Sequence, residues 1–193
     1  GRRAHPSRDK LVMSAHFDTK PGTPGALDNA AGVATVLALA ERLAAEPPTN
    51  LEFVFFNGED HYAAPGEVIY LAGCGGELGR TALVINVDGV GLRDAPTTIA
   101  FFNCPDAWAD ATRGLMSRHH NVAETEPWPQ GDHSIFAMQD VSCIALTSGG
   151  IHSVIDSLIH TPQDTLDRLD PARLAATVGF LAELLAQPLP SPA

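Results

Sequence analysis

The amino-acid sequence predicts an α/β fold, a three-layer sandwich with a mostly parallel central sheet and helices on both faces. Short apolar or β-branched runs alternate along the chain with longer segments rich in helix-forming residues. This alternation is typical of parallel strands, because each strand needs a crossover helix to return the chain to the same edge of the sheet. The length of 193 residues fits one domain, so we expect a single domain over residues 1–193.

The strands are predicted from short, largely apolar runs, which are typical of strands buried in an α/β sheet. The run LEFVFFN, for example, places four large apolar side chains and a β-branched one in seven positions. The predicted strands cover residues 10–15, 51–57, 82–87, 97–103 and 141–147.

The helices are predicted from their composition and from the residues that bound them. Residues 30–46 are rich in Ala and Leu and stop before Pro47 and Pro48, which cannot continue a helix. For the last helix, Asp170 at the N-cap and Pro171 at the first helical position form the preferred start. The predicted helices cover residues 30–46, 65–72, 105–119 and 171–186, with a helical turn at 134–138, a loop at 124–131 and linker-like ends at 1–9 and 187–193.

The charge of the chain narrows the range of partners. Twelve Lys and Arg stand against 23 Asp and Glu, which gives a formal net charge of −11. Proteins that bind nucleic acid usually carry a basic patch, and here the positive charges are scattered. We therefore expect neither nucleic acid nor an anionic membrane surface as a partner, and an acidic chain favours metal cations, amines and the positively charged ends of peptides.

Hydropathy argues against a membrane-spanning protein, and cysteine content argues against a disulfide-stabilised or cysteine-zinc protein. The longest uncharged apolar stretch, residues 30–40, is far shorter than the roughly 20 residues that a membrane-crossing helix needs. The three cysteines are dispersed and form no C-x-x-C pair, which argues against a disulfide framework and a cysteine zinc site. We expect a soluble protein, either cytoplasmic or secreted with its leader removed, since the chain begins at Gly1 and not at Met.

Acidic and imidazole side chains follow three of the predicted strands. His16 and Asp18 come after the first strand, Glu59 and Asp60 after the second, and Asp88 after the third. In open α/β sheets the carboxyl ends of the strands form the crevice where ligands bind. Two more polar groups stand in predicted loops, at Asp28 and His160.

Together these side chains suit divalent cations. Neutral imidazole and carboxylate oxygen are the ligands that zinc accepts in catalytic sites. Four carboxylates close together would otherwise have to stay partly protonated. Two cations sharing one carboxylate would remove that conflict and leave one carboxylate free to act as a base.

Six motifs in order carry a resemblance to a known family. The sequence resembles the zinc-dependent aminopeptidases, a family that includes bacterial leucyl aminopeptidase and aminopeptidase S and is related to glutamate carboxypeptidase II and glutaminyl cyclase. The matching segments cover nearly the whole chain: AHFDT (15–19), GALDNAAG (25–32), FNGED (56–60), NVDGVG (86–91), GDHSIF (131–136) and IHTPQDT (159–165).

The resemblance implies a role for each of these residues. It implies two zinc ions, with cobalt or manganese as alternatives, and hydrolysis of the first residue from peptides with a free N-terminus. The implied roles are His16 and Asp88 as ligands of one metal, Asp60 and His160 of the other, Asp28 as the bridging carboxylate, Glu59 as the general base, Asp18 as the carboxylate that orients His16, and Asp132 and His133 as residues that either contact the substrate or support those that do.

The sequence departs from the family pattern at three places. Asp60 stands where most members have Glu, and Ile159 precedes His160 where some members carry a Tyr that stabilises the oxyanion. The resemblance also implies a short N-terminal part, because relatives place a helix and a strand hairpin before the first catalytic strand. Two alternatives therefore stay open: a single-zinc glutaminyl cyclase, which would not need both His16 and Asp88, and a non-catalytic relative that binds metal or peptide.

Overall fold

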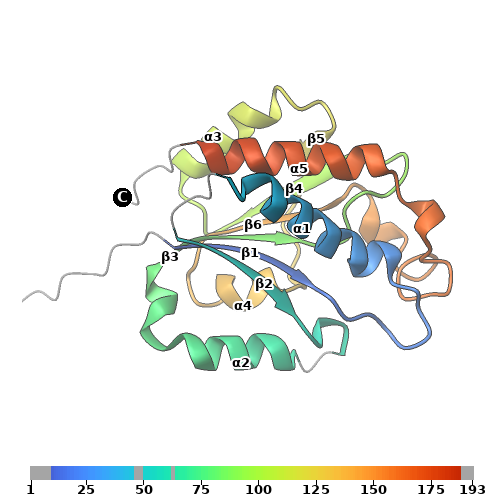
Figure 1. Cartoon of the computed structure of the whole chain (residues 1–193), viewed down its shortest axis with the longest axis horizontal. Helices are drawn as coiled ribbons and strands as arrows, with labels where there is room; N and C mark the ends of the chain where they lie inside the picture. The colour runs from blue at the N-terminus through green and yellow to red at the C-terminus, as the bar shows by residue number, and fades with distance from the viewer. Residues whose placement is uncertain (1–9, 46–49, 62–63, 188–193) are drawn as a thin grey trace, which may run out of the picture.

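The computed structural model describes residues 10–45, 50–61 and 64–187, and within them it contains a six-stranded sheet between two layers of helices (Figure 1). The order across the sheet is β2-β1-β3-β6-β4-β5. β4 runs antiparallel to β6, and the other neighbouring pairs are parallel. The strands are β1 (Lys10–His16), β2 (Leu51–Phe56), β3 (Thr81–Val87), β4 (Thr97–Phe102), β5 (Val122–Glu124) and β6 (Cys143–Ser148).

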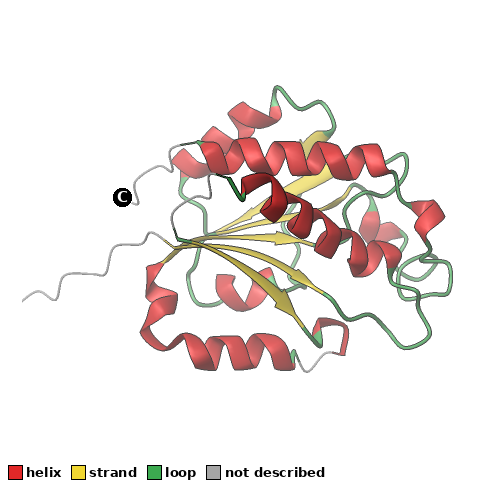
Figure 2. Cartoon of the chain, in the orientation of Figure 1, coloured by secondary structure: helices red, strands yellow, loops and turns green. Residues whose placement is uncertain are grey.

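Helices cover both faces of this sheet, as Figure 2 shows. One layer holds α1 (Ala31–Leu43), α3 (Asp106–Met116) and α5 (Pro171–Ala186), and the other holds α2 (Pro65–Cys74) and α4 (His133–Ala137). The predicted three-layer α/β fold is thereby confirmed. Short helical turns at Ala26–Ala30, Glu59–His61, Gly75–Arg80, Ile151–Ser153 and Leu166–Arg168 join the larger elements.

The hydrophobic core lies on both sides of the central strands. β1 and β3 are almost entirely buried, because their alternating side chains face one helix layer or the other. Beneath α1 and α5 the core includes Leu39 and Phe180, and beneath α2 and α4 it includes Phe56 and Phe136. Each such large side chain contributes about 1.5–3 kcal/mol on burial, so the sheet is a rigid platform for the residues at its edge.

The predicted elements are present, with shifted ends at some of them. α5 has the predicted bounds, and the N–H of Ala172 donates to the Asp170 carboxylate at 2.9 Å, as expected of an N-cap. The predicted helix 30–46 begins at Ala31 and ends at Leu43. The short β5 was not predicted. The linker-like ends 1–9 and 188–193 lie outside the described residues.

Three neighbouring strands bring their carboxyl ends to one edge of the sheet. β2, β1 and β3 lie side by side and run parallel, so the segments that follow Phe56, His16 and Val87 leave the sheet together. This edge holds the polar residues singled out in the sequence. Within the described residues, no helix is both long and apolar enough to cross a membrane.

Candidate metal centre

Five sequence-predicted residues meet at this edge of the sheet. His16 is the last residue of β1, Asp88 directly follows β3, and Asp60 lies in the turn after β2. The two others come from segments between the larger elements: Asp28 from the helical turn before α1, and His160 from the loop that leads to α5. Each of these side chains lies within 3.4 Å of at least one other, although their positions span most of the chain.

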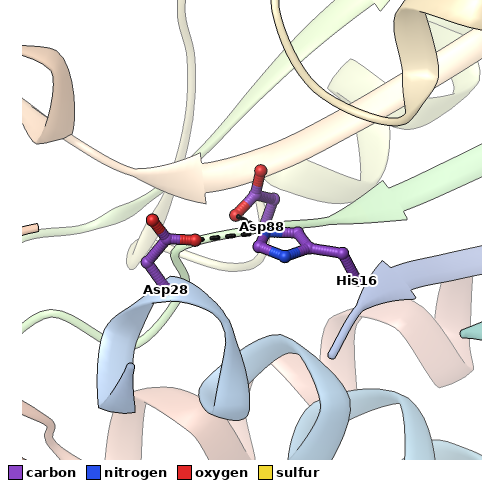
Figure 3. A group of neighbouring side chains, drawn as sticks. All are labelled: His16, Asp28 and Asp88. Atoms are coloured by element: carbon purple, nitrogen blue, oxygen red, sulfur yellow. Dashed lines mark hydrogen bonds and ion pairs between the residues drawn. The ribbon is translucent and has the colours of Figure 1, made fainter. Parts of the chain in front are cut away.

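Asp28 lies at the centre of this arrangement and contacts both histidines. Its Oδ1 is 3.1 Å from Nε2 of His16, and its Oδ2 is 2.9 Å from Nε2 of His160. The Asp28 side chain is buried and reaches from the kinked segment before α1 towards the end of β1, as Figure 3 shows for the His16 side. Each oxygen of one carboxylate thus faces a different imidazole.

The residues form two groups that share Asp28. In the first group, Asp88 Oδ1 lies 3.4 Å from His16 Nε2, the same ring nitrogen that faces Asp28 (Figure 3). In the second group, Asp60 Oδ1 lies 3.0 Å from Nε2 of His160. In each group the candidate ligand atoms all lie within 4.8 Å of one another, which is the spacing of donors around one cation.

The chemistry of the donor set fits divalent cations. Each group offers one imidazole nitrogen and two carboxylates, a mixture found in zinc sites. The second oxygen of Asp60 is buried and has no hydrogen-bond partner among the described residues. Burial disfavours the charged form of His16, but the charge of Asp88 and the hydrogen bond with Asp28 outweigh it and raise the pKa of that imidazole. The pocket therefore attracts positive charge, which protons or metal ions can supply.

Two residues that sequence reasoning missed hold Asp28 in place. Both oxygens of the buried Asp164 carboxylate accept hydrogen bonds from the backbone, from N–H of Leu27 at 2.6 Å and of Asp28 at 3.1 Å. Asn29, joined to Asp28 by a cis peptide bond, donates from Nδ2 to the Val87 carbonyl at 2.9 Å. The available signals were that Asn29 adjoins Asp28 and that Asp164 stands in the same motif as His160.

A glycine makes room for this support. A Cβ on Gly32 would overlap the Asn29 side-chain oxygen and the Val87 carbonyl oxygen. We expect Gly32→Ala to lower the free energy of unfolding by about 1–3 kcal/mol, because overpacking forces such neighbours apart. Chemical denaturation measures the effect. The control is Gly179→Ala in α5, where a Cβ meets nothing within 4 Å and the helix should gain about 0.5–1 kcal/mol; equal stability of the two variants would contradict the prediction.

Asp18 fixes the turn that carries Glu59 and Asp60. One carboxylate oxygen of Asp18 accepts N–H from Gly58 at 2.7 Å and from Glu59 at 3.2 Å, and the other accepts N–H from Asp60 at 3.2 Å. The resemblance implied that this carboxylate orients His16. In the structure, the main-chain oxygen of Asp18 is closer to His16 Nδ1, at 3.2 Å, than the carboxylate, at 3.7 Å. Asp18 therefore acts on both the imidazole and the acidic turn.

Glu59 faces a cleft of about 460 Å³ that opens beside the two groups. Burial raises the pKa of its carboxyl to about 7, and the charge of Asp88 adds to the effect. A carboxyl group that titrates near neutrality can both accept and release a proton under physiological conditions. This property distinguishes Glu59 from Asp28, whose pKa is lowered to about 2 because hydrogen bonds from His16 and His160 outweigh its burial.

Asp132 and His133 lie behind the wall of the cleft and not on its surface. Both are buried, and neither is among the residues that line the cleft. His133 Nε2 lies 3.1 Å from the carbonyl oxygen of Trp128, and burial lowers the pKa of its imidazole. Burial also raises the pKa of Asp132 well above its usual range. Substrate contact by these two residues stays a prediction, and the geometry gives His133 a position supporting the loop that carries Trp128.

Cation binding at this centre is expected to weaken as the pH falls. The hydrogen bond with Asp28 raises the pKa of His160 against its burial, and the pKa of His16 is raised as well. A raised pKa means that each imidazole keeps its proton up to a higher pH, and a protonated imidazole cannot bind a metal. Zinc affinity, measured by competition with a chelator, should therefore rise between about pH 5 and about pH 8. An affinity that stays constant over this range would contradict the assignment of the histidines.

Fold and site together define the class of the protein: an α/β domain with a candidate two-metal centre at the carboxyl ends of its parallel strands. The family follows from comparison of the sequence with known families. Residues 2–185 match Peptidase family M28, and the chain belongs to this family.

Individual relatives share about a quarter to a third of their aligned residues with this chain. The chain is 24% identical over 184 residues to aminopeptidase YwaD of Bacillus subtilis, a match that covers 88% of this chain and 38% of that protein. It is 31% identical over 175 residues to a vacuolar membrane protease of Kluyveromyces lactis, covering 88% of this chain and 18% of that protein. The chain therefore spans well under half the length of these relatives.

Solved structures share the fold at low sequence identity. A zinc aminopeptidase from Bacillus subtilis superposes with a TM-score of 0.76 and 21% identity, covering 94% of this chain and 47% of that chain. A leucine aminopeptidase precursor from Bacteroides thetaiotaomicron superposes with a TM-score of 0.77 and 18% identity, covering 95% of this chain and 73% of that chain. A glutaminyl cyclase from the same organism superposes with a TM-score of 0.78 and 17% identity, covering 95% of this chain and 74% of that chain.

Proposed function

We propose that this protein is a zinc-dependent aminopeptidase that removes the N-terminal residue from peptides. The observation that carries the proposal is the position of Asp28, whose two oxygens each face one histidine of a separate ligand group. Membership of a peptidase family agrees with it. His16 and Asp88 would hold one zinc ion and Asp60 and His160 the other, with Asp28 shared.

Glu59 would perform the proton transfers of the reaction. Bound zinc ions supply Lewis acidity, which makes a water molecule more acidic and polarises the carbonyl group under attack. Glu59 lines the cleft beside the ligand groups, and its pKa of about 7 suits a group that takes a proton from water. The same carboxyl then donates that proton to the departing amine, which completes the cleavage of the peptide bond.

The charge of the cleft supports recognition of a free N-terminus. Its lining includes six acidic residues and one lysine, and that lysine forms an ion pair with Asp60. An α-ammonium group is attracted to such a surface, and an acetylated N-terminus has lost the charge that would be recognised. The acidic residues in the lining are Asp28, Glu59, Asp60, Glu67, Asp88 and Asp156.

The test is a panel of substrates given to the zinc-loaded protein. Aminoacyl p-nitroanilides with a free amine should be hydrolysed, and their N-acetylated counterparts should not. Removal of zinc with a chelator should abolish hydrolysis, and zinc should restore it. Cleavage confined to internal peptide bonds would overturn the assignment as an aminopeptidase.

A single-zinc glutaminyl cyclase is the second candidate, favoured by the structural likeness to such an enzyme. The discriminating residues are His16 and Asp88, which complete a second ligand group with Asp28 and which a one-metal enzyme would not need. A peptide with N-terminal glutamine decides between the two. Formation of pyroglutamate with one zinc ion bound would reverse our assignment.

A further inference from the structure

The helix α2 buries its charged side chain and exposes two of its apolar side chains. Glu67 is the one charged residue of its sequence PGEVIYLAGC, and it is 1% exposed. Two adjacent apolar side chains face solvent instead, Val68 at 58% and Ile69 at 72% exposure. An amphipathic helix packed only for stability would show the opposite arrangement, so the inward position of Glu67 calls for a reason beyond packing.

Glu67 lies in the wall of the cleft beside a second buried carboxyl group. It belongs to the residues that line the cleft, and it lies close to Asp132, which is also 1% exposed. Oε2 of Glu67 and both oxygens of Asp132 are buried without a hydrogen-bond partner. In the part of the chain that the structure describes, no lysine or arginine pairs with either carboxyl. Buried carboxylates are stable only when a cation or a donor meets them.

The acidic groups of the cleft divide into two sets. Asp28, Asp60 and Asp88 belong to the two candidate ligand groups, where divalent cations would balance their charge. Glu67 is in neither group, so metal ions bound there would not meet its carboxyl group. The cleft wall therefore holds a buried pair of carboxyl groups, Glu67 and Asp132, set apart from the candidate metal ligands.

Part of the cleft wall is apolar. Trp128, Ile135, Ile151 and Ile155 line the same cleft, and Ile135 lies in α4, which packs against α2 through the ring contact between Tyr70 and Phe136 at 5.8 Å. A cleft lined by apolar side chains and by a carboxyl group outside the metal-ligand groups matches a side chain with a hydrocarbon stem and a charged tip. Lysine and arginine have this form, since their stems pack on apolar surface while the tip seeks an anion.

We propose that Glu67 is a specificity-determining residue that selects substrates whose N-terminal residue is lysine or arginine. The ammonium or guanidinium group would pair with the Glu67 carboxylate, and the aliphatic stem would lie along the apolar wall. This inference rests on the proposed function, because it treats the cleft as the place where the N-terminal residue of a peptide binds.

The test compares two side chains that differ in one charge. Lysine and norleucine share the four-carbon chain, and norleucine lacks the ammonium group. The ratio of kcat/KM for the lysyl and norleucyl p-nitroanilides should exceed about tenfold in the zinc-loaded protein and fall close to one in Glu67→Gln. Glu67→Asp, which keeps the charge on a shorter stem, should recover part of the ratio. A ratio near one in the unmodified protein, or an unchanged ratio in Glu67→Gln, would overturn the proposal.

A matched control and a binding measurement separate the possible failures. Besides Glu59, the proposed base, Asp156 is the other acidic residue that lines the cleft outside the ligand groups, and Asp156→Asn should preserve most of the ratio; its loss there would overturn the role of Glu67. Calorimetric binding of lysinamide and norleucinamide to the zinc-loaded Glu59→Gln protein needs no turnover. The inference predicts that this protein binds lysinamide more tightly than norleucinamide, and that adding Glu67→Gln removes the preference. If this result is found but no substrate is hydrolysed by the unmodified protein, the inference is supported and only the proposed function fails.

Discussion

Replacing Glu59 with glutamine is expected to lower kcat by about 10²–10⁴-fold, the range that a positioned general base contributes. The amide has nearly the same shape but cannot accept a proton from water. Glu59 belongs to neither candidate ligand group, so the variant should bind the same amount of zinc as the unmodified protein. Steady-state kinetics on the best substrate of the panel measure the loss, and elemental analysis measures the zinc.

The pH dependence of the unmodified protein supplies a second view of the same residue. Since the pKa of Glu59 is about 7 without metal and nearby cations favour the ionised form, the acidic limb of the kcat profile should lie at or below this pH. Glu59→Gln should remove that limb. Residual activity close to that of the unmodified protein, with zinc retained, would show that another group acts as the base and would favour a binding role for the cleft.

Replacing Asp28 with alanine should abolish the binding of both metal ions. Asp28 is the one residue common to the two ligand groups, and each of its oxygens faces a different histidine. Loss of residues that only orient metal ligands already weakens affinity about 10–100-fold, so loss of a shared ligand should weaken it further at both positions. Zinc titration monitored by calorimetry gives the affinities, and circular dichroism checks the fold.

Asp88→Ala is the matched control, because Asp88 belongs to one group alone. It should weaken one zinc site and leave the site of Asp60 and His160 in place. Two ions retained in Asp28→Ala, or both lost in Asp88→Ala, would contradict the arrangement of the ligands around a shared carboxylate.

Sequence reasoning located the metal-binding candidates because their positions follow from the fold. In a parallel sheet the carboxyl ends of adjacent strands meet at one edge, so residues at or just beyond the ends of β1, β2 and β3 had to lie close together. The start of α5 was equally predictable, since Asp170 and Pro171 act through their own backbone neighbours. Local rules and strand direction suffice for features of this kind.

Features that depend on long-range packing were beyond these rules. Asp164 acts on the backbone of residues 27 and 28, more than 130 positions away, and no local pattern records such a contact. The three-residue β5 is too short for a hydrophobic pattern, and its pairing with β4 is set by the tertiary structure. The helix expected from residue 30 in fact follows a kink at Asp28 and Asn29. That kink turns Asp28 towards His16 and His160.

A crystal structure of the zinc-loaded protein, with anomalous diffraction at the zinc edge, tests the central claim most directly. We expect two peaks about 3.5–4 Å apart, on either side of the Asp28 carboxylate, one beside His16 and Asp88 and the other beside Asp60 and His160. A single peak, or peaks away from these five side chains, would contradict the two-metal account.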